Sequence, residues 1–433
     1  MLSAMKTKRL VLLLLLVAFL IRVVTVILTC EKNIGHGDAS SYNSYAIAIL
    51  QNEDWMTDPD FYGEFRPPVY PMLIALVYAV FGTNNLLTVY MFQAVIGVLT
   101  CLYIYKFSRM IFDDKIAVLS LVWSACYIYY LQNMGILMRE TVIFFLLLIF
   151  FYYLYLYLKE RKTMSRNLWF SLLFYCILIH TDPRYLFFLP FLVALFVVFQ
   201  SSKQGVRNYF VFVGLTILLM VPWTIRNYVA YGNFVLINTR TVDLRGVAKR
   251  NPAMDQRLTV NILNLGVISQ TSNEDYPTEE ERELIKKGEN PNNRTDREIE
   301  AIKKDVYPAS TFWERKWFQF KEFWRPFRFR CEYRPFPDCR FVCWSLKHNL
   351  VSILCYGLLL PFMMYGIVDL LFKKNRIVWF LVFPLVIQTL LHSLQWAKTR
   401  YRNPIDAFVI ILAFYGLTQV YKFLKKKYNL VKM

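Results

Sequence analysis

Apolar runs long enough to cross a lipid bilayer recur along most of this chain. The first extends from Leu10 to Thr29, directly after three basic residues, and similar runs return as far as residue 421. A transmembrane helix needs about 20 apolar residues, and it satisfies its own backbone hydrogen bonds, as the lipid environment requires. Hydrophobic residues make up 56% of the 433 residues. The sequence therefore predicts an all-α polytopic membrane protein.

The first run also has features of a secretory signal peptide, because a basic segment precedes it. We interpret it as a retained span, because it is long and no A-x-A-like cleavage site follows it. A lipid anchor on Cys30 is a weaker interpretation, since many further spans follow.

Basic residues in short loops predict the topology. The formal net charge is +19, which in a soluble protein would suggest a nucleic-acid partner. In a membrane protein, Lys and Arg gather instead in cytoplasmic loops. Five basic clusters fit that rule: Lys106/Arg109/Lys115, Lys159/Arg161/Lys162/Arg166, Lys203/Arg207, Lys373/Lys374/Arg376 and the 422–432 tail. We therefore expect no nucleic-acid partner, a plasma (inner) membrane location and two cytoplasmic termini.

Ten spans satisfy this charge pattern: 10–30, 86–105, 117–132, 141–158, 167–181, 185–200, 209–225, 349–371, 377–393 and 404–421. They divide the chain into three parts. These are an N-terminal seven-span catalytic module (1–225) with a first outer loop at 31–85, an extracytoplasmic domain (226–348), and a C-terminal three-span module with a basic tail (349–433).

Two further helices are expected at the membrane surface. Pro67 and Pro68 begin a short apolar helix that ends at Phe81. If this helix crossed the membrane, the later basic loops would face outward, so we expect it to be interfacial or re-entrant. The aromatic segment 312–324 repeats Trp and Phe at near-helical spacing, which is typical of a helix lying in the membrane interface. A helix that faces the core of the outer domain is the alternative.

Three cysteines of the outer domain, Cys331, Cys339 and Cys343, lie where a disulfide is chemically permitted. With His348 they form the pattern C-x7-C-x3-C-x4-H, which is not a usual zinc spacing. A disulfide is therefore favoured over a metal site, and its pairing stays open.

Asp38 is the first candidate for chemistry. It lies in the segment HGDASSYNSYA, a few residues beyond the first apolar run and therefore near the membrane surface. A carboxylate in this place can act as the base of a reaction at the membrane, and it can also simply cap a helix.

Further polar residues accumulate at the outer ends of the predicted spans. Ionisable residues at span ends are costly to desolvate and are often functional. The outer set is Asp38, Tyr42, Arg66, Tyr70, Arg139, Glu140, His180, Asp182, Arg184, Arg226, Asn227, Lys398, Arg400 and Arg402. The positive-inside rule does not account for arginines on this side. Because arginine binds phosphate oxygens bidentately, the set indicates a phosphate or pyrophosphate at the membrane surface.

Each of these residues also has a structural interpretation. Arg139 and Glu140 could form a loop ion pair, which contributes little when exposed. Asp182 precedes a proline and suits a tight turn. Arg400 and Arg402 could extend from a span end toward water.

Four segments resemble a known superfamily. They are, in chain order, GDASSYNSYA, RPPVYPMLIALVYAVFG, PWTIRNYVAYGNFVLINT and TRYRNPIDAFVIILA. With the polar stretch TDREIEAIKKDVYP before the aromatic helix, they resemble the GT-C fold glycosyltransferases that use polyprenyl-phosphate sugars. This superfamily includes the protein O-mannosyltransferases and the bacterial aminoarabinose transferases that modify lipid A. Seven spans before an outer domain is also the arrangement that the resemblance implies.

The resemblance implies an enzyme that moves one sugar from a polyprenyl-phosphate donor to a glycan, lipid or protein acceptor at the outer membrane face, with inversion. Asp38 stands where the family has its catalytic aspartate and would be the general base. The donor phosphate would be bound by Arg66, Arg184, Arg226, Arg400 and Arg402, with Tyr42 and Tyr70 positioning sugar or phosphate oxygens. The residues expected to bind the acceptor or to support the site are Arg139, Glu140, His180 and Asp182.

One feature departs from the family pattern. Many relatives carry two adjacent acidic residues in the first outer loop, whereas Asp38 is followed by Ala39. We therefore expect no cofactor and favour a metal-independent site, with a divalent cation left open. Two other classes also stay open, a lipid-linked glycan ligase or polymerase and a transporter or flippase of an anionic lipid. A transporter is disfavoured because no internal repeat is visible and the early spans are nearly free of charge.

Overall fold

Helices form almost the whole of the described structure. The structure is a computed structural model, and it describes residues 2–30, 38–52, 67–231, 234, 236–237, 312–327, 332–333, 341–342, 345–394 and 399–431. Within these residues there are two short strands, β1 (Glu332–Tyr333) and β2 (Phe341–Val342), which pair antiparallel. Most of the predicted outer domain, including Cys331, Cys339 and Cys343, lies outside the described residues.

The N-terminal part of the bundle consists of eleven helical segments. They are α1 (Leu2–Thr29), α2 (Asp38–Gln51), α3 (Val69–Phe81), α4 (Leu86–Ile111), α5 (Asp114–Cys126), α6 (Ile128–Leu131), α7 (Glu140–Glu160), α8 (Arg166–Thr181), the 3₁₀ helix η3 (Pro183–Phe191), α9 (Leu192–Phe199) and α10 (Ser202–Tyr231).

The C-terminal part begins with the aromatic helix α15 (Phe312–Trp324). It continues with α16 (Leu346–Ser352), the π-helical turn η6 (Ile353–Gly357), α17 (Leu359–Phe372), α18 (Ile377–Leu394), the 3₁₀ turns η7 (Thr399–Tyr401) and η8 (Asn403–Ile405), and α19 (Asp406–Val431).

Each of the ten predicted spans has a helical counterpart. Seven helices among the described residues are long and apolar enough to cross a membrane: Thr7–Thr29, Leu86–Ile111, Glu140–Glu160, Ser202–Val229, Leu346–Phe372, Ile377–Leu394 and Thr399–Tyr428. The other three predicted spans correspond to shorter pieces. One is α5 with α6, the second is the 16-residue α8, and the third is η3 followed by α9. The chain is thus a helical membrane protein, and ten spans remains a prediction.

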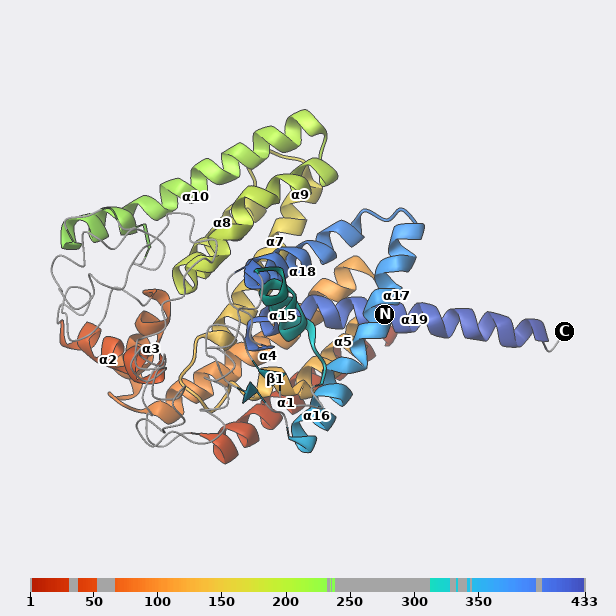
Figure 1. Cartoon of the computed structure of the whole chain (residues 1–433), viewed down its shortest axis with the longest axis horizontal. Helices are drawn as coiled ribbons and strands as arrows, with labels where there is room; N and C mark the ends of the chain where they lie inside the picture. Colours follow the sequence, from red (N-terminus) through yellow and green to blue (C-terminus); the bar gives the residue numbers. More distant parts are fainter. Residues whose placement is uncertain are drawn as a thin grey trace, which may run out of the picture.

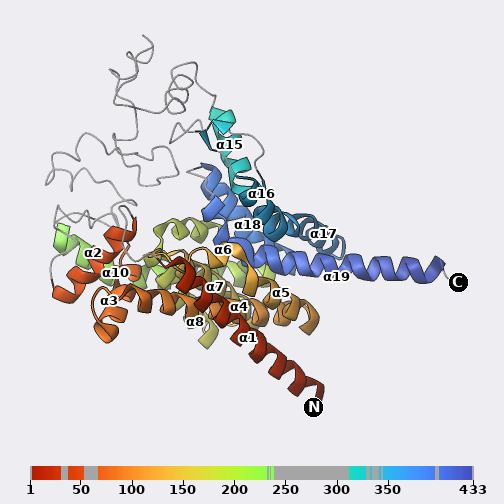
Figure 2. The ribbon, with the colours of Figure 1, turned by 90° about the horizontal axis from the view of Figure 1, so that it is seen from below.

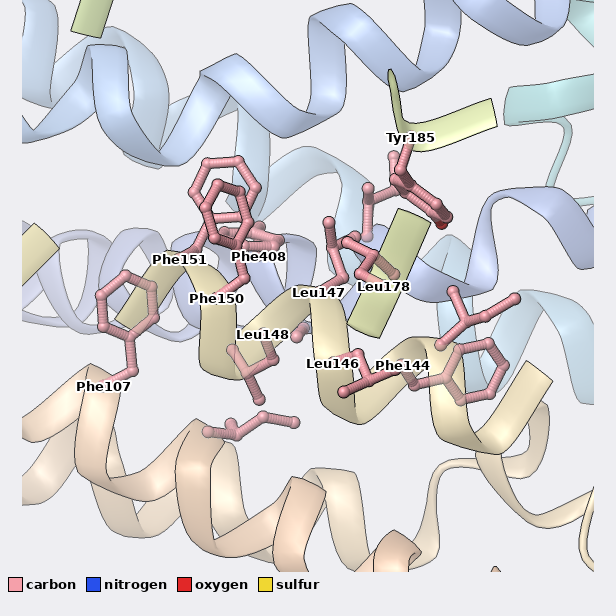
Figure 3. Close-up of a cluster of buried hydrophobic side chains, with 14 of the residues drawn as sticks. Phe107, Phe144, Leu146, Leu147, Leu148, Phe150, Phe151, Leu178, Tyr185 and Phe408 are labelled. Carbon is pink, nitrogen blue, oxygen red and sulfur yellow. The ribbon is translucent and has the colours of Figure 1, made fainter. Parts of the chain in front are cut away.

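Helix α7 is the centre of the bundle. Its apolar residues are buried on nearly every side (Figure 3), where they face Phe107 of α4, Leu178 of α8 and Phe408 of α19. Phe151 illustrates the packing, since its ring centroid lies 5.3 Å from that of Phe408 and 5.5 Å from that of Phe380. Side chains from both membrane modules therefore share one core. By contrast, the leucines of α1 are largely exposed, as suits a helix that faces lipid.

The C-terminal helices approach each other through glycines. A Cβ atom on Gly416 of α19 would lie 1.9 Å from the carbonyl oxygen of Phe362, and one on Gly366 of α17 would lie 2.6 Å from the carbonyl oxygen of Leu412. Small residues let two helix backbones approach this closely, as is common between membrane helices. The contact fixes α19, and with it the turns η7 and η8 that precede it.

The basic loops meet at one end of the bundle. Four contacts join them: Lys115 over the Tyr421 ring, Lys373 with Gln419, Arg207 with Thr163, and Arg376 with the Val198 carbonyl. Helix α7 runs from Glu140 to Glu160 at this basic end. The start of α1 and the end of α19 extend from the same side of the bundle, away from α2 and α3 (Figures 1 and 2).

A buried arginine in the first span was not anticipated. Arg22 of α1 is fully buried and donates to the carbonyls of Ser124 and Ala125, at 3.3 and 3.2 Å. These carbonyls belong to the last turn of α5, where helical carbonyls have no helical partner and the helix dipole favours a cation. Gly97 leaves space for the side chain, since a Cβ atom there would lie 2.6 Å from Nε of Arg22. The positive charge of Arg22 is therefore stabilised by the carbonyl end of α5, and we assign the residue a structural role.

Candidate functional site

Asp38 is the first residue of α2, and α2 packs on α3. One turn later Tyr42 contacts Tyr70 of α3 edge to face, with ring centroids 4.9 Å apart. The Tyr70 hydroxyl donates to Oε1 of Gln93 at 2.8 Å, and Nε2 of Gln93 donates to the Ile136 carbonyl at 2.9 Å. These contacts hold α2 and α3 against α4 and the segment before α7. Helix α3 begins at Val69, one residue after Pro68, and Pro68 occupies its N-cap position.

Asp182 is the centre of a buried ionic cluster. Its carboxylate, 2% exposed, accepts from Nε of Arg184 at 2.9 Å and from Nη2 at 2.5 Å. Arg139 approaches the same carboxylate at 3.4 Å and donates to the Thr181 carbonyl at 3.0 Å. The Asp182 side chain also accepts from the backbone N–H of Arg184. The turn and the ion pair expected for Asp182 and Arg139 are thus one structure, although the partner of Arg139 is Asp182 rather than Glu140.

Electrostatics favour the charged state of this cluster. Burial alone would raise the pKa of Asp182, but Arg139 and Arg184 outweigh that effect and hold it well below its ordinary value. Burial likewise opposes the charge on Arg139, yet the Asp182 carboxylate holds its pKa above the ordinary value. We conclude that all three groups are charged at neutral pH.

Arg400 lies beside the carboxylate at the start of α7. Its Nε is 4.0 Å from Oε1 of Glu140, the first residue of α7, and its charge interacts with that of Asp38. The Arg400 side chain is 37% exposed, whereas that of Glu140 is 10% exposed. Oε2 of Glu140 is buried and has no hydrogen-bond partner among the described residues. The first outer loop, the start of α7 and the turn η7 therefore meet in one place.

Arg402, two residues further on, has a different environment. It is fully buried, its Nε lies 3.1 Å from Oδ1 of Asp406, and the Asp406 carboxylate also accepts from the Tyr127 hydroxyl at 2.7 Å. The guanidinium lies 3.4 Å from the ring centroid of Tyr356 in the π-helical turn and 4.9 Å from that of Tyr129. The structure therefore places Arg402 inside the bundle and not in the cluster around Arg400.

His180 and Arg226 meet through Trp223. The ring centroids of His180 and Trp223 are 6.3 Å apart, and the Arg226 guanidinium lies 5.3 Å from the Trp223 ring centroid. His180 is also bonded through Nδ1 to the Cys176 carbonyl at 2.7 Å. Trp223 and Asn227 both donate to the Ile237 carbonyl, so the chain after α10 folds back onto that helix.

The structure thus brings together most of the predicted site residues at the end of the bundle opposite the basic loops. Arg139, Asp182 and Arg184 form one ionic cluster, Arg400 lies beside Glu140 and shares the Tyr401 ring with Arg184, and Tyr42 packs on Tyr70. Asp38 interacts electrostatically with Arg400, and His180 lies in the last turn of α8, directly before Asp182. Arg66 and Lys398 lie outside the described residues. Among the residues that are described, no three His, Cys, Asp or Glu side chains come together as metal ligands.

Sequence reasoning missed a second set of polar residues in α18. Gln388 donates through Nε2 to the Tyr401 carbonyl at 3.1 Å and lies 3.1 Å from Nε2 of His392. Gln388 also lies 3.4 Å from the Tyr185 hydroxyl. The signal was available, since Gln388 and His392 are one helical turn apart in a mainly apolar span, and polar residues there are often functional.

Comparison with known proteins gives one family model. Residues 65–225, less than half of the chain, match the model described as dolichyl-phosphate-mannose-protein mannosyltransferase. No curated protein matches the chain.

Solved structures share the fold. The apo oligosaccharyltransferase of Archaeoglobus fulgidus aligns with a TM-score of 0.58 and 16% identity, over 97% of this chain and 51% of that one. The same archaeal enzyme, AglB, in complex with an inhibitory peptide and a dolichol-phosphate aligns with a TM-score of 0.57 and 16% identity. The alignment covers 98% of this chain and 52% of that one. Apo ArnT from Cupriavidus metallidurans aligns with a TM-score of 0.54 and 12% identity, over 95% of this chain and 60% of that one. The chain therefore spans about half the length of AglB, and the likeness establishes a shared fold.

Proposed function

We propose that this membrane protein, which has the GT-C fold, transfers a single sugar from a polyprenyl-phosphate donor to an acceptor at the outer membrane face. One observation carries the proposal. Asp38, at the start of α2, lies in the electrostatic field of Arg400, which comes from the other end of the chain. The proposed base and the proposed cation thus interact electrostatically, and Arg400 also lies 4.0 Å from Oε1 of Glu140 at the end of the bundle opposite the basic loops.

The proposed reaction is a single displacement at the anomeric carbon. An acceptor hydroxyl or amine attacks this carbon from the face opposite the phosphate, so the new bond inverts the configuration. The bond between the anomeric carbon and the phosphate oxygen breaks, and its electron pair leaves with the lipid phosphate. The proton of the acceptor passes to the Asp38 carboxylate, which acts as general base.

Arginine stabilises the leaving phosphate in this proposal. Arg139 and Arg184 are hydrogen-bonded or paired to Asp182, whereas the nearest carboxylate oxygen to Arg400 is 4.0 Å away. Of these three arginines, Arg400 is therefore the one best able to turn toward a phosphate, and charge-assisted bonds to phosphate are among the strong ones. Preorganised cations at the leaving group lower the barrier because they stabilise charge that develops in the transition state. Arg66 and Arg226 are proposed to contribute from the neighbouring segments.

We propose a metal-independent site. Ala39 stands where many relatives have a second acidic residue, and Arg400 supplies a positive charge that interacts with Asp38. Donor lipid and acceptor are the proposed partners. AglB forms a complex with a dolichol-phosphate and an inhibitory peptide, which supports a lipid phosphate as the donor group here and leaves the acceptor class open.

The proposed orientation places both termini and the basic loops in the cytoplasm and the Asp38 end outside. This orientation is supported by the position of the basic loops, which lie together at one end of the bundle, because Lys and Arg favour the cytoplasmic side. Helix α15 is proposed to lie in the outer membrane interface. Trp313 and Trp317 are 77% and 59% exposed, while Gln319 and Glu322 of the same helix are buried. Exposed tryptophans beside buried polar residues suit a lipid headgroup environment.

The test is transfer of radiolabelled sugar from polyprenyl-phosphate donors by the purified protein, with and without EDTA. We expect Asp38→Asn to abolish transfer and EDTA to leave it unchanged. The matched control is Asp114→Asn, an exposed carboxylate at the basic end of the bundle. Turnover that persists in Asp38→Asn would exclude Asp38 as the base. Transfer only from a lipid pyrophosphate glycan would instead indicate a ligase, and lipid movement without transfer would indicate a flippase.

A further inference from the structure

Tyr401 holds two arginines of the candidate site on one aromatic ring. The Arg184 guanidinium lies 4.5 Å from the ring centroid, and that of Arg400 lies 5.1 Å from it. Nη2 of Arg400 also donates to the Tyr401 hydroxyl at 3.2 Å. A guanidinium beside an aromatic face is attracted by the negative face of the ring, most strongly where water is displaced. One side chain of η7 therefore links Arg184 of η3 to Arg400.

The two arginines depend on this ring to different degrees. Arg184 is also held by Asp182, through both Nε and Nη2. Arg400 has a carboxylate oxygen of Glu140 at 4.0 Å, and its Nε is buried with no hydrogen-bond partner among the described residues. Removal of the ring therefore frees Arg400 while Arg184 stays anchored.

A column of stacked rings fixes Tyr401. The His392 ring of α18 is nearly parallel to that of Tyr401, at 9° and a centroid distance of 4.8 Å. The Phe323 ring of α15 is in turn nearly parallel to that of His392, at 16° and 5.7 Å. Phe323 and His392 are both almost completely buried. Offset stacking of this kind adds to the area that the rings bury.

The backbone of η7 is fixed by the same helix. Nε2 of Gln388 donates to the Tyr401 carbonyl at 3.1 Å, and in this amide orientation His392 accepts through Nε2. Helix α18 therefore positions both the ring of Tyr401, through His392, and its carbonyl, through Gln388, and α15 adds Phe323 to the other side of His392.

We propose that Tyr401 is a positioning residue for Arg400, and that the stack of Phe323, His392 and Tyr401 makes this position depend on the docking of α15. Helix α15 thereby influences the proposed donor-binding arginine without touching the donor. The kinetic part of this inference rests on the proposed function.

The kinetic test compares Tyr401→Leu and Tyr401→Phe with the wild type. Loss of a desolvated cation–π contact predicts a fall in kcat/KM for the donor of roughly threefold to thirtyfold in Tyr401→Leu. Tyr401→Phe keeps the ring and loses only the hydroxyl bond, so its fall should be smaller. In an Arg400→Gln background, Tyr401→Leu should lower kcat/KM for the donor almost no further, because the two residues act as one unit. Fully additive losses would show that Tyr401 acts through general stability and would overturn the proposal.

Phe323→Leu tests the distant end of the column. Like Tyr401→Leu, it should lower kcat/KM for the donor, and it should lower it no further in an Arg400→Gln background. Trp324→Leu is the matched control, because Trp324 is the next residue of α15 but donates to Thr389 and does not stack on His392. Equal losses in the two variants would assign the effect to α15 docking in general and would exclude the ring column.

A structural measurement decides the positioning claim without turnover. Cryo-electron microscopy of Tyr401→Leu should show Arg400 displaced while Arg184 remains on Asp182. An unmoved Arg400 would overturn the proposal. If Tyr401→Leu does not fold, Phe323→Leu provides the same comparison, with Trp324→Leu as its control. A wild type that transfers no sugar refutes the proposed function, and the structural comparison still decides the position of Arg400.

Discussion

The Arg184 guanidinium binds both oxygens of the Asp182 carboxylate, with Nε 2.9 Å from Oδ1 and Nη2 2.5 Å from Oδ2. Pro183 separates the two residues, so the pair closes the sharp turn between α8 and η3. Arg139 joins the same carboxylate from the start of α7. One buried carboxylate therefore connects three helix ends beside the candidate site.

Asp182→Asn should be strongly destabilising. The substitution leaves two partly buried arginines without their buried carboxylate, and breaking one side of a buried ion pair costs about 3–5 kcal/mol. We expect a large fall in the apparent melting temperature of the purified protein in detergent. Asp114→Asn is the control, because Asp114 and Arg109 form a pair with both side chains 53% exposed, and such pairs contribute at most about 1 kcal/mol. Equal effects would refute the role given to Asp182.

The stability that Asp182 provides should depend on pH only in strong acid. Its folded pKa is depressed, because Arg139 and Arg184 outweigh the effect of burial. The contribution is therefore complete above the ordinary aspartate pKa of about 3.9. It is lost as the pH falls below that value and through the lower folded pKa. The difference in melting temperature between wild type and Asp182→Asn should be constant from about pH 5 to 8. A difference that disappears near pH 6 would contradict the assignment.

Arg400 and Arg402 should respond oppositely to the same substitution. Arg402→Gln leaves Asp406 buried without its cation, so it should lower stability by several kcal/mol, about 3–5 by analogy with other buried pairs. Arg400→Gln should change stability little and lower kcat/KM for the donor by at least about tenfold, as expected for loss of a charge-assisted phosphate contact. Melting temperatures and transfer rates measured on both variants distinguish the roles. A donor defect in stable Arg402→Gln protein would restore Arg402 to the site.

Gly416→Ala should disrupt the contact between α17 and α19. The added Cβ atom would lie 1.9 Å from the Phe362 carbonyl oxygen, a backbone atom that cannot move independently. Overpacking typically costs about 1–3 kcal/mol and can cost more. Gly214→Ala on α10 is the control, since nothing lies within 4 Å of its Cβ position. There we expect a change within about 1 kcal/mol, set by helix propensity. The yield of folded protein and its melting temperature in detergent check both.

The aromatic face of α15 should contact lipid. A spin label at position 320 should be accessible to oxygen and protected from a water-soluble nickel complex in reconstituted vesicles. A label at position 321 is the control, because the next residue points about 100° around the helix. Phe320 is exposed and stacks on Trp317 with centroids 5.4 Å apart, so the two belong to one face. Equal nickel accessibility at both positions would place this face in water.

Local sequence patterns predicted much of the fold because span length and apolar composition are local properties. Helices α4, α7 and α18 lie where their apolar runs predicted them, and α3 ends at Phe81 as expected. The same reasoning treated Arg400 and Arg402 as equivalent, since both lie at one span end. Their environments differ because successive residues of a helical turn point in different directions, and only packing decides which one faces the core. Arg22 was overlooked because the carbonyls that satisfy it belong to α5.

The sequence by itself determined a helical membrane protein with its basic loops between apolar runs, and it singled out Asp38 and a set of arginines at the predicted outer span ends. Composition and spacing suffice for that, because lipid imposes one rule on every segment that crosses it. Only the tertiary structure decided which of those arginines are held by Asp182 and Asp406 and which stands beside Glu140. It also brought Phe323, His392 and Tyr401 into one column. Such pairings join residues distant in the chain, and they depend on how the helices pack rather than on any local pattern.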